Sequence, residues 1–224
     1  MVKRKISLEI YIIAGIITIS VLIAGVYFGL FLSGEKVKFL ESELARVRIS
    51  GDDATLQFVL LNFFPNESCS ILEERFYEIQ MKTAKLGSKV EEYERTEKIK
   101  APEFYELKKA YTIILLNYWY YAKKLKEECN QTFLTILYFY SNVYCPDCPK
   151  QGAALGYIKE KYREKAMIFS LDFDLGKELG SVKLLRLGYN VTIVPTLVVD
   201  DERYEGLVTA DELEKIFYSK LAIG

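Results

Sequence analysis

The stretch that decides the fold of the C-terminal part is six residues long: Tyr144-Cys145-Pro146-Asp147-Cys148-Pro149. It follows an apolar run over residues 133–140 and precedes a segment with helical spacing over residues 150–165. Two cysteines three residues apart at a strand-to-helix junction can close a small disulfide and open it again. Cys145 would lie at a helix N-terminus, where free N–H groups and the helix dipole favour a thiolate. The spacing therefore predicts Cys145 as a nucleophile and Cys148, one turn along, as the thiol that resolves a mixed disulfide.

The composition limits what else the chain can do. It contains 30 basic and 31 acidic residues, a net charge of −1, so no basic excess indicates a nucleic-acid partner. It contains no histidine, which excludes Ser-His-Asp and Cys-His catalytic sites and any zinc site with a histidine ligand. A lone Cys-x-x-Cys can also be half of a metal site, but no second pair at metal spacing accompanies it. We therefore expect redox chemistry at the thiols, with neither a metal nor a cofactor.

Strands and helices alternate after residue 132. The predicted elements are a strand over 133–140, a helix over 150–165, a strand over 166–172, a helix over 176–187, strands over 196–199 and 203–205, and a helix from 210 to about 221. Thr209 and Glu212 have the spacing of a capping box at the start of the last helix. The predicted order is βαβαββα.

This order resembles the thioredoxin superfamily over residues 132–221. The motifs that carry the resemblance are Cys145-Pro146-Asp147-Cys148 and Ile193-Val194-Pro195-Thr196. The resemblance implies an α/β domain that exchanges disulfides without a cofactor. It also implies that Pro195 is cis and faces the cysteine pair, and that Val194 and Pro195 line the groove where the substrate backbone binds. A non-catalytic thioredoxin-like docking module remains the alternative.

Two positions depart from the family's pattern. Phe139 stands where thioredoxins proper keep a buried acid, and Asp147 replaces the residues found between the cysteines of strong oxidants. A carboxylate at Asp147 disfavours a thiolate at Cys145, and a stabilised thiolate is what makes a strong oxidant. We therefore predict a reduction potential below the value of about −120 mV of the strongest bacterial oxidase.

The middle of the chain has helical spacing without strand-like alternation. Two apolar stripes, over 72–93 and 104–125, are separated by Ala101-Pro102 and predict an antiparallel, coiled-coil-like hairpin. In such a hairpin Cys69 and Cys129 fall at the same end, offset by about one turn or roughly 6 Å, near the Cα separation that a disulfide needs. We predict a structural disulfide between them. Two unrelated free thiols are the alternative.

The N-terminal part has the features of a membrane anchor. Residues 10–32 carry no charge, and 23 residues of helix are long enough to cross a hydrocarbon core of about 30 Å. The basic cluster at residues 3–5 places the N-terminus in the cytoplasm and the rest outside. Gly25, Gly29 and Ser33 lie on one helix face and favour a homodimer. A cleaved signal peptide or a buried core helix is the alternative.

These features predict three parts: residues 1–34, the cytoplasmic N-terminus and transmembrane signal anchor; 35–130, an α-helical domain; and 131–224, the thioredoxin-like domain. The predicted protein is a single-pass protein of the cell membrane with its C-terminal domain outside the cytoplasm. Its expected partners are cysteine-containing exported proteins and a redox partner that regenerates the cysteine pair.

Overall fold

The computed structural model of the chain describes residues 11–27, 53, 56, 60, 68–95 and 102–223. The chain divides into two compact units, residues 1–48 and 49–224, and each is described by itself. Gly29, Ser33 and the predicted boundary after residue 34 lie outside the described residues, as does most of the segment 35–67.

In the first unit, residues 11–27 form a helix whose side chains are all exposed. Within the part of the chain that the structure describes, no helix combines the length and the apolar character needed to cross a bilayer.

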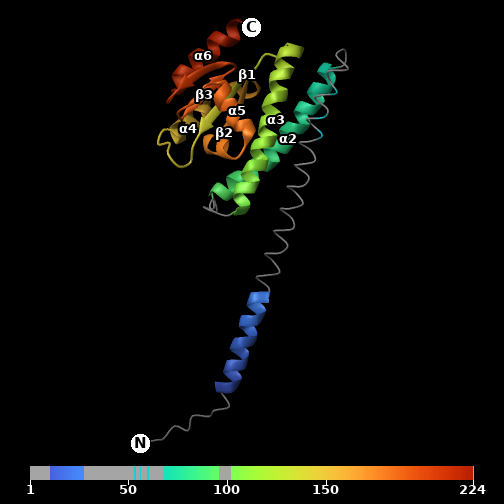
Figure 1. Ribbon diagram of the computed structural model, residues 1–224, viewed down its shortest axis with the longest axis vertical. Coiled ribbons are helices and arrows are strands. Elements are labelled where there is room, and N and C mark those ends of the chain that lie inside the picture. Colours follow the sequence, from blue (N-terminus) through green and yellow to red (C-terminus); the bar gives the residue numbers. More distant parts are fainter. Residues whose placement is uncertain are drawn as a thin grey trace, which may run out of the picture. The chain divides into compact units, whose positions relative to one another are not determined.

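Two long helices, α2 (Ser68–Arg95) and α3 (Pro102–Cys129), lie side by side in the second unit (Figure 1). The ring of Phe76 lies 5.0 Å from that of Tyr118, and Tyr93 lies 6.1 Å from Phe104. Residue numbers therefore rise along one helix as they fall along the other, so the predicted antiparallel hairpin is present. Its buried residues follow the predicted stripes, because spacing of three and four keeps side chains on one helix face.

The open end of the hairpin carries a disulfide. Cys69 is bonded to Cys129, with a Cα–Cα distance of 5.6 Å. Asn130 follows at a positive φ of 53°, a conformation that asparagine tolerates, and turns the chain from α3 into the first strand.

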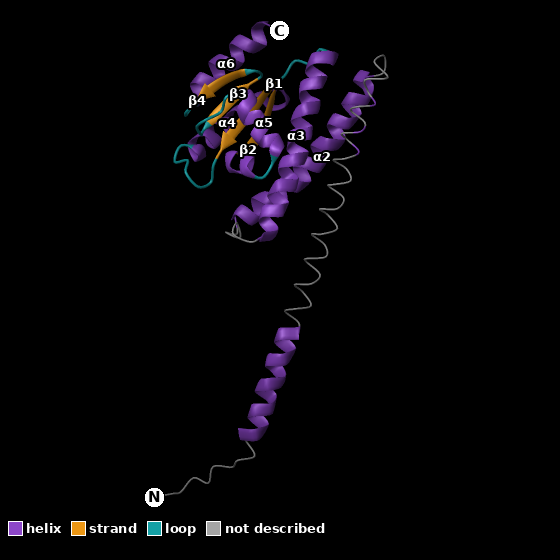
Figure 2. Cartoon of the chain, in the orientation of Figure 1, coloured by secondary structure: helices purple, strands orange, loops and turns teal. Residues whose placement is uncertain are grey.

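The rest of the unit is built on a four-stranded sheet with the order β2-β1-β3-β4 (Figure 2). The strands are β1 (Leu134–Tyr140), β2 (Ala166–Asp172), β3 (Thr196–Val199) and β4 (Glu202–Glu205). β1 is parallel to β2 and antiparallel to β3, which is antiparallel to β4. All of β1 except Tyr140 is buried, as expected for a central strand covered on both faces.

Helices cover both faces of this sheet. Ile136 and Tyr138 of β1 share a core cluster with residues of α4 (Cys148–Tyr162) and α6 (Ala210–Ile223). On the opposite face, Tyr118 of α3 packs edge-on against Phe169 of β2, with ring centroids 5.2 Å apart. The hairpin thus shares a core with the sheet, and the structure gives no support to a separate coiled coil.

Three helical segments differ from the prediction or extend it. The helix after the cysteine motif begins at Cys148, two residues early, and ends in a 3-10 turn, η3 (Arg163–Lys165). The segment predicted as one helix over 176–187 is divided into η4 (Phe173–Lys177) and α5 (Gly180–Gly188), because Leu179 is extended between them. The capping box of α6 is confirmed: Thr209 N–H donates to the Glu212 carboxylate at 2.8 Å.

Candidate functional site

The two cysteines of the motif lie between β1 and α4, bonded to each other with their Cα atoms 5.3 Å apart. Cys148 is buried, with 6% of its surface exposed, whereas Cys145 is only partly buried. α4 begins at Cys148 with Asp147 as its N-cap, so Cys145 lies in the turn before the helix and not in its first turn. The unequal exposure makes Cys145 the thiol that a second protein can reach.

Two prolines shape this turn. Pro146 follows Cys145, and Pro149 lies in the first turn of α4, where an N–H has no partner within the helix in any case. The Cys148 N–H donates to the Cys145 carbonyl at 3.3 Å and closes the turn. The Asp147 side chain makes no capping bond and pairs instead with Lys150 at 2.9 Å. Both side chains are exposed, so solvent screens the pair and it partly offsets the Asp147 charge.

The peptide bond between Val194 and Pro195 is cis, as the resemblance implies. Val194 packs against the core cluster that contains Cys148, and Cys145 packs against the same cluster. Pro195 itself is buried, and its carbonyl accepts the Gly206 N–H at 2.9 Å. The fold therefore brings the Val194 side chain and the cysteine pair, which are 46 residues or more apart in sequence, to one cluster.

Tyr138, and not Phe139, is the residue of β1 that contacts the cysteine pair. Its hydroxyl donates to the Cys148 carbonyl at 2.7 Å, and burial raises the pKa of Tyr138 to about 12, which keeps it a donor. Side chains alternate along a strand, so Phe139 points to the opposite face. The position that the resemblance matches to the buried acid of thioredoxins therefore lies on the face of β1 away from the cluster that contains Cys148.

The loop over residues 141–144 is held by Ser141. Its hydroxyl donates to Asp174 at 2.6 Å and accepts the N–H groups of Val143 at 3.1 Å and Tyr144 at 3.4 Å. Ser141 and Asp174 are 33 residues apart and belong to no motif, so no sequence pattern predicts their contact.

Exposed apolar side chains lie close in sequence to Cys145 and to Pro195. Tyr144 is 84% exposed, Val143 is 64% exposed and Ile193 is 50% exposed. Among the residues that the structure describes, no group of three potential metal ligands is placed to hold a metal ion.

The comparisons with known proteins are distant. The sequence matches no protein-family model. No curated protein matches it either.

Similar solved structures include a protein described as a malarial protein, chloroplastic thioredoxin z and a thioredoxin of Fasciola hepatica. The malarial protein is 19% identical with a TM-score of 0.34, and the match covers 40% of this chain and 98% of the other. Thioredoxin z is 17% identical with a TM-score of 0.36, covering 46% and 90%. The Fasciola thioredoxin is 19% identical with a TM-score of 0.35, covering 45% and 92%.

At these TM-scores the likeness adds no argument of its own. The order of strands and helices along the chain, the cysteine pair before α4 and the cis bond before β3 are those that the resemblance implied. On these features of the chain itself, residues 134–223 form a thioredoxin-like α/β module with a paired Cys145 and Cys148.

Proposed function

We propose that the chain is a membrane-anchored thiol–disulfide oxidoreductase that faces the extracytoplasmic side. The observation that carries the chemistry is the Cys145–Cys148 disulfide, in which Cys145 is partly buried and Cys148 is buried. Val194 packs against the core cluster that contains Cys148, and the bond from Val194 to Pro195 is cis. Val194 and Pro195 line the groove for the substrate backbone, and the exposed apolar residues Tyr144 and Ile193 contact substrate on either side.

Each turnover moves two electrons. In the dithiol form, the Cys145 thiolate attacks one sulfur of a substrate disulfide, that bond breaks, and the substrate's other sulfur leaves as a thiolate that takes up a proton. The Cys148 thiolate then attacks the Cys145 sulfur, which releases the second substrate thiol and leaves the Cys145–Cys148 disulfide. The pair is oxidised and the substrate reduced; the reverse sequence oxidises a substrate dithiol. A redox partner restores the starting form of the pair.

A redox titration tests this function. The full chain in detergent is equilibrated with glutathione buffers, and all four cysteines are mapped by mass spectrometry. We expect one two-electron transition at Cys145 and Cys148, at a potential more negative than about −120 mV. Cys69 and Cys129 should stay bonded through this transition. Absence of a reversible transition at Cys145 and Cys148 would refute the proposal and favour a docking module.

The membrane anchor belongs to the same proposal. Residues 10–32 carry no charge, and the helix over 11–27 exposes isoleucine, leucine, valine and tyrosine side chains all round. A helix that is apolar on every side requires an apolar surrounding. The basic residues 3–5 put its N-terminus in the cytoplasm, so the cysteine pair lies outside, where exported proteins acquire disulfides.

Thiol labelling in intact cells tests the location. After mild reduction, a membrane-impermeant maleimide added outside should label Cys145 of the full chain. A cysteine introduced near the N-terminus, Ser7→Cys, is the control and should be labelled only after the membrane is permeabilised. The reverse pattern would show that the orientation is wrong.

A further inference from the structure

Lys108 is a charged residue buried where α3 meets the sheet. Its Nζ lies 2.5 Å from Oδ2 of Asp172, and only 7% and 10% of the two side chains are exposed. Glu94 of α2 lies 3.8 Å from the same Nζ, and the ring centroids of Phe104 and Tyr140 lie 5.6 Å and 5.4 Å away. A buried charge is costly unless it is paired and hydrogen-bonded, so this ammonium group is specifically accommodated by both the hairpin and the sheet.

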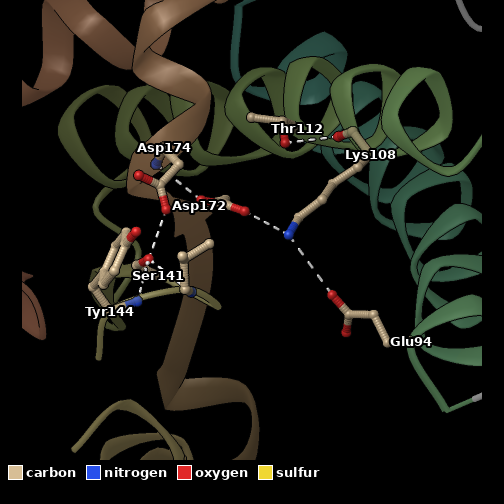
Figure 3. A network of polar contacts seen from close by, with 8 residues as sticks. Glu94, Lys108, Thr112, Ser141, Tyr144, Asp172 and Asp174 are labelled. Carbon is tan, nitrogen blue, oxygen red and sulfur yellow. Dashed lines mark hydrogen bonds and ion pairs between the residues drawn. The ribbon is translucent and has the colours of Figure 1, made fainter. Parts of the chain in front are cut away.

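A continuous series of hydrogen bonds leads from Lys108 to the loop over residues 141–144, which directly precedes Cys145 (Figure 3). The other oxygen of Asp172, Oδ1, accepts the Asp174 N–H at 2.9 Å and starts the 3-10 turn η4. Asp174 in turn accepts the Ser141 hydroxyl at 2.6 Å, and Ser141 accepts the N–H groups of Val143 and Tyr144. Tyr144 directly precedes Cys145. Each acceptor therefore orients the next donor, from the second turn of α3 to the residue before Cys145.

This chain of contacts ends on backbone and not on sulfur. Ser141 holds two successive N–H groups, which fixes the path of residues 141–144 between β1 and the motif. Cys148 is held independently, by its burial and by the Tyr138 hydroxyl on its carbonyl. The separation of the two sulfurs thus depends on the loop on one side and on the core on the other.

We propose that Lys108 and Ser141 are positioning residues for the Cys145–Cys148 pair, through which the helical hairpin sets the equilibrium between dithiol and disulfide. This inference rests on the proposed function. The contacts from Lys108 to Ser141 are present in the structure with the Cys145–Cys148 disulfide formed. They therefore hold Cys145 in a position from which this disulfide can close. Loosening the loop lowers the effective concentration of one thiol at the other, which favours the dithiol and makes the reduction potential less negative.

The experiment measures one balanced reaction in the full chain: protein dithiol plus glutathione disulfide gives protein disulfide plus two glutathione thiols. Lys108→Met and Ser141→Ala should each lower its equilibrium constant about 5- to 10-fold, and tenfold corresponds to about 30 mV toward less negative potential. Because both residues act through one chain of contacts, the double variant should fall no further than the larger single effect, within about twofold.

Two matched controls accompany these variants. Lys109→Met removes the neighbouring lysine, which pairs with Glu106 at 2.5 Å and Glu178 at 3.3 Å instead of with Asp172. Ser219→Ala removes a hydroxyl that donates to the Ile216 carbonyl on α6. Both controls should keep the wild-type equilibrium constant within about twofold.

The outcomes separate this inference from the proposed function. If the equilibrium constant of Ser141→Ala equals that of the wild type, the inference is overturned, whatever the constant of Lys108→Met. Additive effects of the two substitutions in the double variant also overturn it. If Lys108→Met does not fold, Ser141→Ala still decides, and Lys108→Met/Asp172→Asn removes both buried charges together. A wild-type chain without a reversible transition overturns the proposed function and this inference with it. If the wild-type chain shows the reversible transition and the variants have the same equilibrium constant as the wild type, only the inference is overturned.

Discussion

Replacement of Cys145 by serine should abolish thiol–disulfide exchange, with a fall in rate of at least about 10³-fold, the order expected when a covalent nucleophile is removed. Cys148 cannot take over, because only 6% of its surface is exposed and its carbonyl is held by Tyr138 in the core. The measurement is the rate of mixed-disulfide formation by the reduced full chain with excess glutathione disulfide, followed by mass spectrometry.

Cys148→Ser is the matched control for that experiment. It keeps the accessible thiol and removes the resolving one, so the mixed disulfide at Cys145 should form and then accumulate. The two variants differ from each other only in which sulfur remains. If Cys145→Ser formed the adduct as fast as Cys148→Ser, the assignment of the nucleophile would be wrong.

Removal of the other disulfide should leave exchange intact and cost stability. Cys69 and Cys129 are separated by 60 residues along the chain. In the chain-entropy model a crosslink over a loop of about 60 residues contributes about 4 kcal/mol, because it restricts the unfolded state. Cys69→Ser/Cys129→Ser should therefore lower the melting temperature by roughly 10 °C, measured by circular dichroism of the full chain in detergent.

The control is the double variant Cys145→Ser/Cys148→Ser, which removes a crosslink between residues only three positions apart. The same model assigns so short a loop about 2 kcal/mol, half the effect of the long one. Equal losses of stability in the two double variants would contradict the structural role of the long crosslink. A loss of exchange activity in Cys69→Ser/Cys129→Ser, once the protein is folded, would contradict its separation from the site.

The position of this disulfide explains why it should affect stability and not exchange. It ties the first turn of α2 to the last residue of α3, at the open end of the hairpin, where helix ends otherwise fray. Lys108 lies 21 residues from Cys129, near the other end of α3. The contacts of Lys108 with Asp172 are therefore distant from the crosslink.

Much of the fold could be predicted because its determinants are local. The bounds of β2 and β3 match the predicted strands, and the capping box placed the start of α6, since side-chain alternation and capping act over a few residues. The break between η4 and α5 was missed. Asp172 starts the first turn with its own side chain, a role that depends on where the end of β2 lies in the sheet.

The site, like the fold, could be predicted from the sequence only in part. The spacing of Cys145 and Cys148 by itself predicted that they could form a disulfide, and two stripes with a proline between them were sufficient to pair Cys69 with Cys129. Which side of β1 faces the cysteines, Tyr138 or Phe139, depended on the length of the intervening loop and was decided only by the tertiary structure. The link from Lys108 to Ser141 also exists only in three dimensions, because its members come from a helix, a strand end, a 3-10 turn and a loop. Local rules fix residue types at short spacing, whereas a buried charge finds its partner only when the packing of distant elements excludes water around both.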